Sequence, residues 1–118
     1  MQDVIETFIQ GVLEPLGYPV SQTPGDASAQ TWLTWNTVRG DGITASDQVT
    51  RLRHTFQVHA WTHGFASEHR QAFFAAIDAL KAAGVRVFSW GMDEREKDTG
   101  ISHIAATCYW KQREGVRT

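Results

Sequence analysis

The chain has 118 residues, of which 42% are hydrophobic and 20% charged, and this size and balance indicate one folded domain rather than a disordered segment. Its formal net charge of −2 argues against a dedicated nucleic-acid-binding protein, because such proteins usually carry a basic excess that neutralises phosphates. The single cysteine, Cys108, excludes an internal disulfide and a zinc site built from several thiolates.

Aromatic residues are abundant for so short a chain, with five tryptophans, six phenylalanines and two tyrosines. One core of this size does not easily enclose them all, and aromatic side chains are enriched at the centres of protein interfaces. We therefore expect some of them to contact a partner. A tryptophan-rich core with half-covered rings is the alternative.

The first predicted element is an amphipathic helix over residues 4–13. Its apolar side chains recur at helical spacing: Val4, Ile5, Phe8, Ile9, Val12 and Leu13. Asp3 is placed to cap this helix, and Pro15 and Pro19 end it. Residues 18–30 are rich in Pro, Gly and small polar side chains, and they predict a loop.

Two strands are predicted next. Residues 31–38 are rich in β-branched and aromatic types, which favour strands. Residues 49–61 alternate in polarity, as expected for a sheet with one solvated side, and the apolar set is Leu52, Phe56, Val58 and Ala60. Residues 39–48 are too many for a tight turn, so they predict an extended loop, a kind of segment that is often functional.

The second half of the chain predicts a helix over residues 67–84, with Phe74 at the border of its buried side. The buried side consists of Phe73, Ala76, Ile77 and Leu80. A strand over residues 85–90, a charged loop over 91–100 and a strand over 101–112 follow. The last strand places four side chains on one face: Ile104, Ala106, Cys108 and Trp110.

These elements predict an α+β fold in the order α-β-β-α-β-β, a two-layer domain in which two helices cover one face of an antiparallel four-stranded sheet. We expect a single domain over residues 1–112 and a mobile polar tail over residues 113–118. Such a sheet has at least two open edges and one helix-free face, which a monomer must protect and an assembly uses.

Four of the five histidines lie close together in the sequence: His54, His59, His63 and His69. On a strand, His54 and His59 point to opposite faces, while His59 and His63 share a face but stand roughly 13 Å apart. No cysteine or HExxH pattern supports them as ligands. We therefore expect scattered surface histidines, with no metal and no cofactor.

Enzyme and membrane signatures are also missing from the sequence. It contains no G-x-S-x-G elbow and no glycine-rich phosphate loop, and Cys108 on an apolar strand face is expected to behave as a small hydrophobe. We assign no catalytic residue and expect no enzymatic activity. Arg39-Gly40-Asp41 spells an adhesion tripeptide, but Gly-Asp-Gly is equally good turn chemistry. With no apolar run of roughly 20 residues and no signal-peptide pattern, we expect folding in a reducing cytoplasm and no membrane contact.

The loop before the last strand is charged. Its acidic residues are Asp93, Glu94, Glu96 and Asp98, and Arg95 and Lys97 alternate with them. Such a run is commonly a solvated hairpin end. The alternative is a contact that selects a partner by complementary charge.

One arrangement runs through most of the chain. The amphipathic helix is followed by Leu16-Gly17-Tyr18-Pro19-Val20 and a polar loop, then by the strand Arg53-His-Thr-Phe-Gln-Val-His-Ala-Trp61. The helix over 67–84, the charged turn around 92–99 and the closing strand over 100–109 complete it. In pattern and length this arrangement resembles the tail terminator (tail completion) protein family of long-tailed bacteriophages and related prophage elements.

The resemblance implies a structural role in virus assembly. Members of this family are small α+β subunits that close into a hexameric ring on the finished tail tube, where the ring stops polymerisation and offers a surface to head-completion proteins. Such a ring needs a heterologous interface that closes on itself. The implied partners are further copies of the chain, the major tail tube protein and a head-completion or connector protein, without nucleic acid. The implied location is the virion tail, after assembly in the host cytoplasm.

Candidate contact residues follow from position and residue type. For contacts between subunits we select Trp35, Trp61, Phe74 and Tyr109. For contacts with the tube or head partner we select Asp93, Glu94, Glu96 and Asp98. Two other functions stay open: a phage neck or head-completion subunit, and a small ligand-binding domain or enzyme that uses His54 or His103 in a pocket. A nucleic-acid module with stacking aromatics is opposed by the acidic balance.

Overall fold

The computed structural model describes residues 4–23, 25, 28–45, 48–64, 67–91 and 93–113, with the backbone alone for residues 39–45, 48–53, 90, 112 and 113. Its elements, in chain order, are α1 (Val4–Leu13), the 3-10 helix η1 (Glu14–Leu16), β1 (Val20–Gln22), β2 (Thr31–Ala45), β3 (Gln48–His63), α2 (Glu68–Ala82), β4 (Arg86–Trp90), β5 (Glu94–Arg95) and β6 (Ile101–Arg113). The predicted α+β class is confirmed.

The strands form one mixed sheet in the order β1-β2-β3-β6-β4, with β5 paired to β6. β1 runs parallel to β2, and the other neighbours are antiparallel. The predicted antiparallel sheet of four strands therefore needs correction: the sheet has six strands and is mixed. β1 and β5 were missed because three and two residues are too short to show an alternating pattern.

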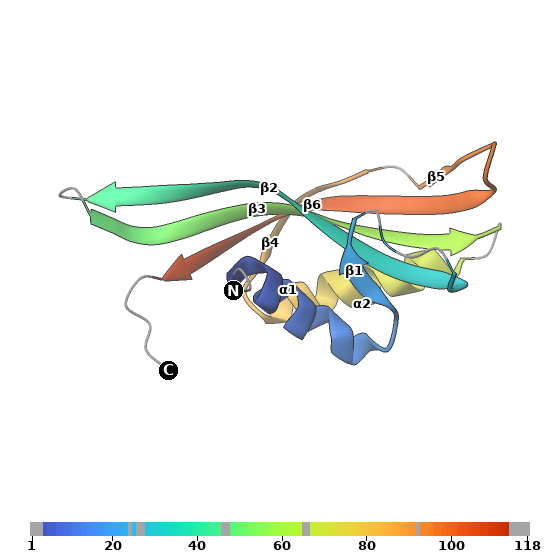
Figure 1. The fold of residues 1–118 in the computed structure, drawn as a ribbon, viewed down its shortest axis with the longest axis horizontal. Coiled ribbons are helices and arrows are strands. Elements are labelled where there is room, and N and C mark those ends of the chain that lie inside the picture. Colours follow the sequence, from blue (N-terminus) through green and yellow to red (C-terminus); the bar gives the residue numbers. More distant parts are fainter. Residues whose placement is uncertain are drawn as a thin grey trace.

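The predicted loop over residues 39–48 is wrong. β2 continues through Ala45 and β3 begins at Gln48, so Gly40-Asp41-Gly42 lies in a strand rather than a turn. The two strands pair with each other along this length, which gives the backbone polar groups partners even where the residues are weak strand formers. This hairpin extends beyond the helices (Figure 1) and contributes to an elongated molecule of 52 × 25 × 25 Å.

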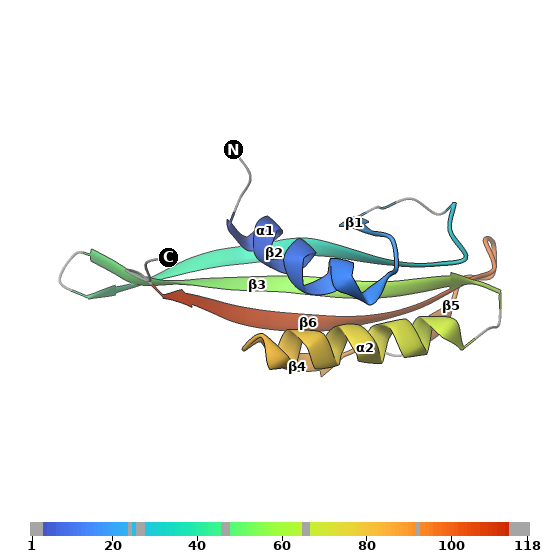
Figure 2. The ribbon, with the colours of Figure 1, turned by 90° about the horizontal axis from the view of Figure 1, so that it is seen from below.

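Both helices lie on the same face of the sheet (Figures 1 and 2). α1 buries Ile5, Ile9 and Leu13, which lie on its predicted apolar side. α2 buries the four residues of its predicted side, Phe73, Ala76, Ile77 and Leu80. It also buries His69 and Ala72. The periodicity of both helices therefore identified the side that faces the sheet.

The central strands supply the other half of the core. Phe56 on β3 lies opposite Cys108 on β6, and Val58 lies opposite Ala106. These side chains are fully or almost fully buried beneath the helices, and they belong to one core cluster that also contains Leu33, Trp35, Ala60, Val85 and Ile104. The predicted alternation is thus confirmed for the described side chains of β3 and β6, whereas the side chain of Leu52 lies outside them. Neither of the two described helices lies on the opposite face of the sheet (Figure 1).

The ends of the elements follow local chemistry. α2 ends at Ala82, and Gly84 takes a φ of +95°, a conformation that glycine adopts without steric cost after a helix. The predicted cap, Asp3, lies outside the described residues. Of the predicted tail, Arg113 belongs to β6, and residues 114–118 are outside the described part of the chain.

Candidate functional site

The helix-free face of the sheet carries a stacked group of aromatic and imidazole rings. Trp61 of β3 stacks on His103 of β6, with ring centroids 3.9 Å apart and planes inclined by 11°. His59 stacks on His103 at 5.0 Å, and Trp32 of β2 lies parallel to Trp61 at 6.1 Å. We call Trp32, Trp61, His59 and His103 the ring ladder. The ladder joins three adjacent strands across a face that no helix covers.

A chain of hydrogen bonds runs through the ladder. His59 Nδ1 lies 2.8 Å from His103 Nε2, and His59 Nε2 lies 2.8 Å from Asn36 Oδ1. Asn36 Nδ2 donates to Gln57 Oε1 at 3.3 Å, which fixes the orientation of the Asn36 amide. Because the Asn36 oxygen accepts, His59 donates from Nε2. In a neutral His59, Nδ1 then accepts from His103 Nε2, and this arrangement satisfies both hydrogen bonds without a charge on either ring.

The environment disfavours protonation of both imidazoles. Burial, followed by the nearby charge of His103, lowers the pKa of His59 to about 4. Burial also lowers the pKa of His103, although the carboxylates of Glu94 and Glu96 act in the opposite direction. An imidazole pair with lowered pKa values is the kind of group that proton-transfer sites use, but structural networks contain such pairs as well.

Thr34 of β2 and the loop after β1 fix the positions of the two tryptophans of the ladder. The Trp61 indole Nε1 donates to the buried Thr34 Oγ1 at 2.9 Å, and Thr23 Oγ1 donates to the same oxygen at 3.0 Å. A Cβ added to Gly25 would lie 2.4 Å from Thr34 Cγ2, so the loop passes directly over this part of the face. Trp32 is consequently buried, and within the described residues its indole N–H has no partner.

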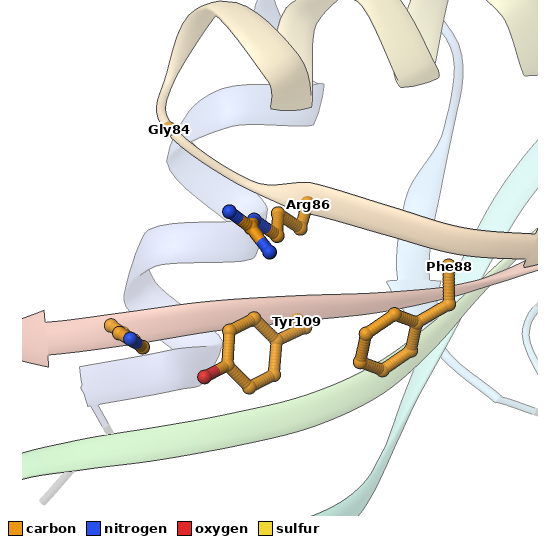
Figure 3. Close-up of a pocket in the computed structure, with 5 residues that line it drawn as sticks. Gly84, Arg86, Phe88 and Tyr109 are labelled. Atoms are coloured by element: carbon orange, nitrogen blue, oxygen red, sulfur yellow. The ribbon is translucent and has the colours of Figure 1, made fainter.

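A second feature lies where β4 and β6 meet. A cavity of about 390 Å³ is lined by Gly84, Arg86, Phe88, Tyr109 and Lys111. The side chains of Arg86, Phe88 and Tyr109 lie next to one another along these two strands (Figure 3), and the Phe88 ring is 5.4 Å from the Tyr109 ring. Within the described part of the chain, neither Arg86 nor Lys111 forms an ion pair. We call these five residues the edge pocket.

The four predicted subunit-contact residues do not form one surface. Trp35 is buried in the core, where its indole Nε1 donates to Gln10 Oε1 at 2.7 Å. Trp61 belongs to the ring ladder and Tyr109 to the edge pocket, both on the helix-free face. Phe74, on α2, is 41% exposed on the other side of the sheet. Their role in subunit contacts stays a prediction.

The four predicted acidic contact residues are likewise in different situations. Asp93 accepts hydrogen bonds from His69 Nε2 at 2.6 Å and from Arg70 Nε at 2.5 Å, so it holds the loop against α2. Burial opposes ionisation of Asp93, but these two bonds outweigh it and hold its pKa below the usual value. Glu94 lies in β5, opposite His103.

The remaining two acids lie near the turn of the loop. Glu96 accepts from Thr99 Oγ1 at 3.0 Å, and its backbone pairs with Ile101 and Gly100. Glu96 thus stabilises the turn before β6. Asp98 is exposed, and its side chain forms no hydrogen bond or ion pair within the described residues. Its contact with a tube or head partner stays a prediction.

The histidines are partly where the sequence placed them. β3 continues to His63, and His54 does point to the opposite face from His59, where it stacks on Trp110 at 5.6 Å. The prediction of a surface position is wrong for His69, which is buried at the start of α2 because the carboxylate of Asp93 gives it a partner. Its Nδ1 has no partner within the described residues.

Potential metal ligands and nucleophiles are sparse in the described residues. No three His, Cys, Asp or Glu side chains come together there in a way that suits a metal ion. Cys108 is fully buried, as predicted, and burial raises the pKa of its thiol to about 12. Neither His54 nor His103 lines the edge pocket.

Sequence reasoning missed two features of the surface. It did not identify Phe88, which is 59% exposed, or Val38, which is 56% exposed. Both lie at positions where the register of strand pairing shifts by one residue. No particular residue type predicts such a shift. It also missed the pairing of His59 with His103, although both lie at polar positions of strands that were predicted correctly.

Comparison with known proteins gives no assignment: no family model matches the chain, and no curated protein sequence matches it. Among the described residues, neither helix has the length and hydrophobicity to cross a bilayer.

Proposed function

We propose that this chain is a structural assembly protein of a phage or prophage tail, a tail terminator subunit without enzymatic activity. Copies of it form a closed ring, most simply a hexamer, that caps the tail tube, stops its polymerisation and presents a surface to the head-completion protein. The likeness in pattern and length to the tail terminator family is one support for this proposal.

The observation that carries the proposal is the pair of open edges on opposite sides of the sheet. β4 lies at one edge, and β2 lies at the other, where β1 covers only Leu33 to Trp35. From Asn36 onward, the outer side of β2 has no strand partner within the described residues. A ring needs two different surfaces on opposite sides of each subunit, and a sheet with two unlike open edges meets that need.

Polymerisation of the tail tube protein in the presence of the chain tests this proposal. We expect electron microscopy to show tubes of limited length with an added ring at one end. We expect light scattering to show an oligomer either at high concentration or on added tubes. Unchanged tube lengths with no bound chain would contradict the proposal. Binding to capped tubes without an effect on their length would favour the neck or head-completion alternative.

A ligand-binding or enzymatic function is the second candidate, and the His59–His103 pair is the observation that favours it. Both imidazoles have lowered pKa values, and they lie on the helix-free face. The variant His103→Gln separates the two functions. Tube capping that persists in this variant supports assembly, whereas a ligand-induced rise in melting temperature that disappears in it supports ligand binding.

A further inference from the structure

The two open edges of the sheet carry matching irregularities. On β2, Thr37 and Arg39 pair with consecutive residues of β3, so Val38 is an extra residue in a bulge. On β4, Val87 and Ser89 pair with consecutive residues of β6, so Phe88 is an extra residue in a bulge. Val38 and Phe88 are two of the large hydrophobic side chains that remain exposed in the described structure. Each edge therefore presents one apolar side chain from a bulge.

Bulges at sheet edges usually prevent one molecule from pairing with another. Charged side chains and prolines at the edge serve the same purpose. Here the bulged residues are valine and phenylalanine, with exposed fractions of 56% and 59%. The Phe88 ring lies beside Tyr109 in the edge pocket, yet more than half of Phe88 and of Val38 is left for a second molecule to bury, and that burial is favourable.

The register of the sheet places the two bulges at the same level along the strands. Thr37 lies opposite Phe56, which lies opposite Cys108, which in turn lies opposite Val87. Val38 follows Thr37, and Phe88 follows Val87. Because each bulged residue lies between two residues that pair with consecutive partners, it is displaced from the row by about half a residue. β2 and β4 run in opposite directions, so the two displacements add to about one residue, roughly 3.4 Å along the strands.

Equal level matters for closure of an assembly. A heterologous contact between patches at different heights adds an axial rise at each step and generates an open filament, whereas patches at equal height allow a closed ring. Because β2 and β4 are antiparallel, copies in the same orientation bring β4 of one beside β2 of the next as an antiparallel pair. The register is thus compatible with closure.

Charge also bears on which edges meet. The β4 edge carries Arg86 and Lys111 in the edge pocket, and within the described residues neither forms an ion pair. On β2, Arg39 directly follows Val38. Two β4 edges facing each other would bring four cations together, whereas a β4 edge facing β2 of another copy brings three together, so the unlike pairing has the smaller charge repulsion.

From these observations we propose that the subunit contact joins the Phe88 bulge on β4 of one copy to the Val38 bulge on β2 of the next. Phe88 packs against Val38, and β4 of one copy lies antiparallel to β2 of the next. This inference rests on the proposed ring and names the surface that closes it. The partner of the edge pocket is therefore a second copy of this chain.

Cysteine cross-linking tests the contact directly, since the only native cysteine, Cys108, is fully buried. In the double variant Val38→Cys/Phe88→Cys, mild oxidation is expected to join copies in series and to end at one closed species. Each single variant is expected to stay uncross-linked, because a heterologous contact pairs unlike positions. The matched control is Val38→Cys/Phe74→Cys, in which Phe74 is also an exposed apolar residue but lies on α2.

Three results would overturn the inference. A dimer of the single variant Phe88→Cys would show that two β4 edges meet instead. A cross-linking yield in the double variant no higher than in the Phe74 control would place the contact elsewhere. A series that grows without a closed end would show a filament.

Light scattering of the unmodified chain and the tube-capping assay separate the two proposals. A ring that caps tubes but does not cross-link leaves the proposed function standing and removes this contact. Loss of both tube capping and cross-linking would contradict both the proposed function and the proposed contact.

Discussion

On the helix-covered face of the sheet, Phe56, Val58 and Ala60 of β3 are fully buried, whereas His59 and Trp61 of the same strand remain partly exposed on the other face. The covered side is filled by apolar packing against α1 and α2. The helix-free side is ordered by ring stacking and by hydrogen bonds between side chains. The side chains of one strand are thus ordered in two ways. Apolar packing needs the layer of helices, whereas ring stacking and hydrogen bonding do not.

Truncation on each face of β3 tests this difference most strongly. Phe56→Ala leaves a cavity in the core and is expected to lower the free energy of unfolding by about 3–5 kcal/mol. Trp61→Ala removes a larger but partly exposed side chain, so we expect a loss of about 1–2 kcal/mol. Urea denaturation measures both values. Equal losses would show that the ladder is packed as tightly as the core.

Removal of one hydroxyl from the helix-free face gives a smaller effect. Thr34→Val keeps the shape of a fully buried side chain but leaves the Trp61 indole N–H and the Thr23 hydroxyl without their acceptor. We expect a loss of about 1–2 kcal/mol. The exposed Thr37 on the same strand provides the control, and Thr37→Val is expected to change stability by less than about 0.5 kcal/mol. A neutral Thr34→Val would mean that the hydrogen bonds do not order this face.

The pH dependence of stability gives the smallest expected effect. Because the pKa of His59 is lowered in the folded state, the unfolded chain binds more protons between pH 6.5 and about 4. The contribution of His59 to the free energy of unfolding is therefore fully present above pH 6.5, and it is lost as the pH decreases toward about 4. We expect about 1 kcal/mol of loss between pH 7 and 5, after a discount for the partial exposure of the ring.

The variant His59→Gln checks this assignment, since an amide does not titrate. Its unfolding midpoints in urea are expected to change less between pH 7 and 5 than those of the unmodified chain. The lowered pKa of His103 has the same sign, so the double variant His59→Gln/His103→Gln is expected to be flatter still. A pH profile that neither variant alters would show that His59 and His103 do not cause the loss of stability at low pH.

The helix-covered face could be predicted from the sequence because burial imposes a period. The apolar sides of α1 and α2 and the alternation through Phe56 and Val58 all follow from one solvent-avoiding surface per element. Cys108 was assigned to the core by the same argument. The two helices and the four longer strands follow from these signals, and they fix the fold class.

The remainder depends on contacts between distant segments. β2 continues through Gly40 and Gly42 because β3 supplies hydrogen-bond partners, which local propensity does not register. His69 is buried because Asp93, distant in sequence, reaches it from the loop before β6. The bulges at Val38 and Phe88 are shifts of register, and the ladder needs three strands in order. None of these features leaves a local pattern.

The buried position of Cys108 has a practical consequence for measurements on this molecule. A thiol that is enclosed by the core and remains protonated at neutral pH reacts with an alkylating reagent only after the sheet has opened. Its labelling rate therefore reports how often the native chain exposes its interior. The protein contains its own probe of conformational opening, positioned at the centre of the region that the two helices protect.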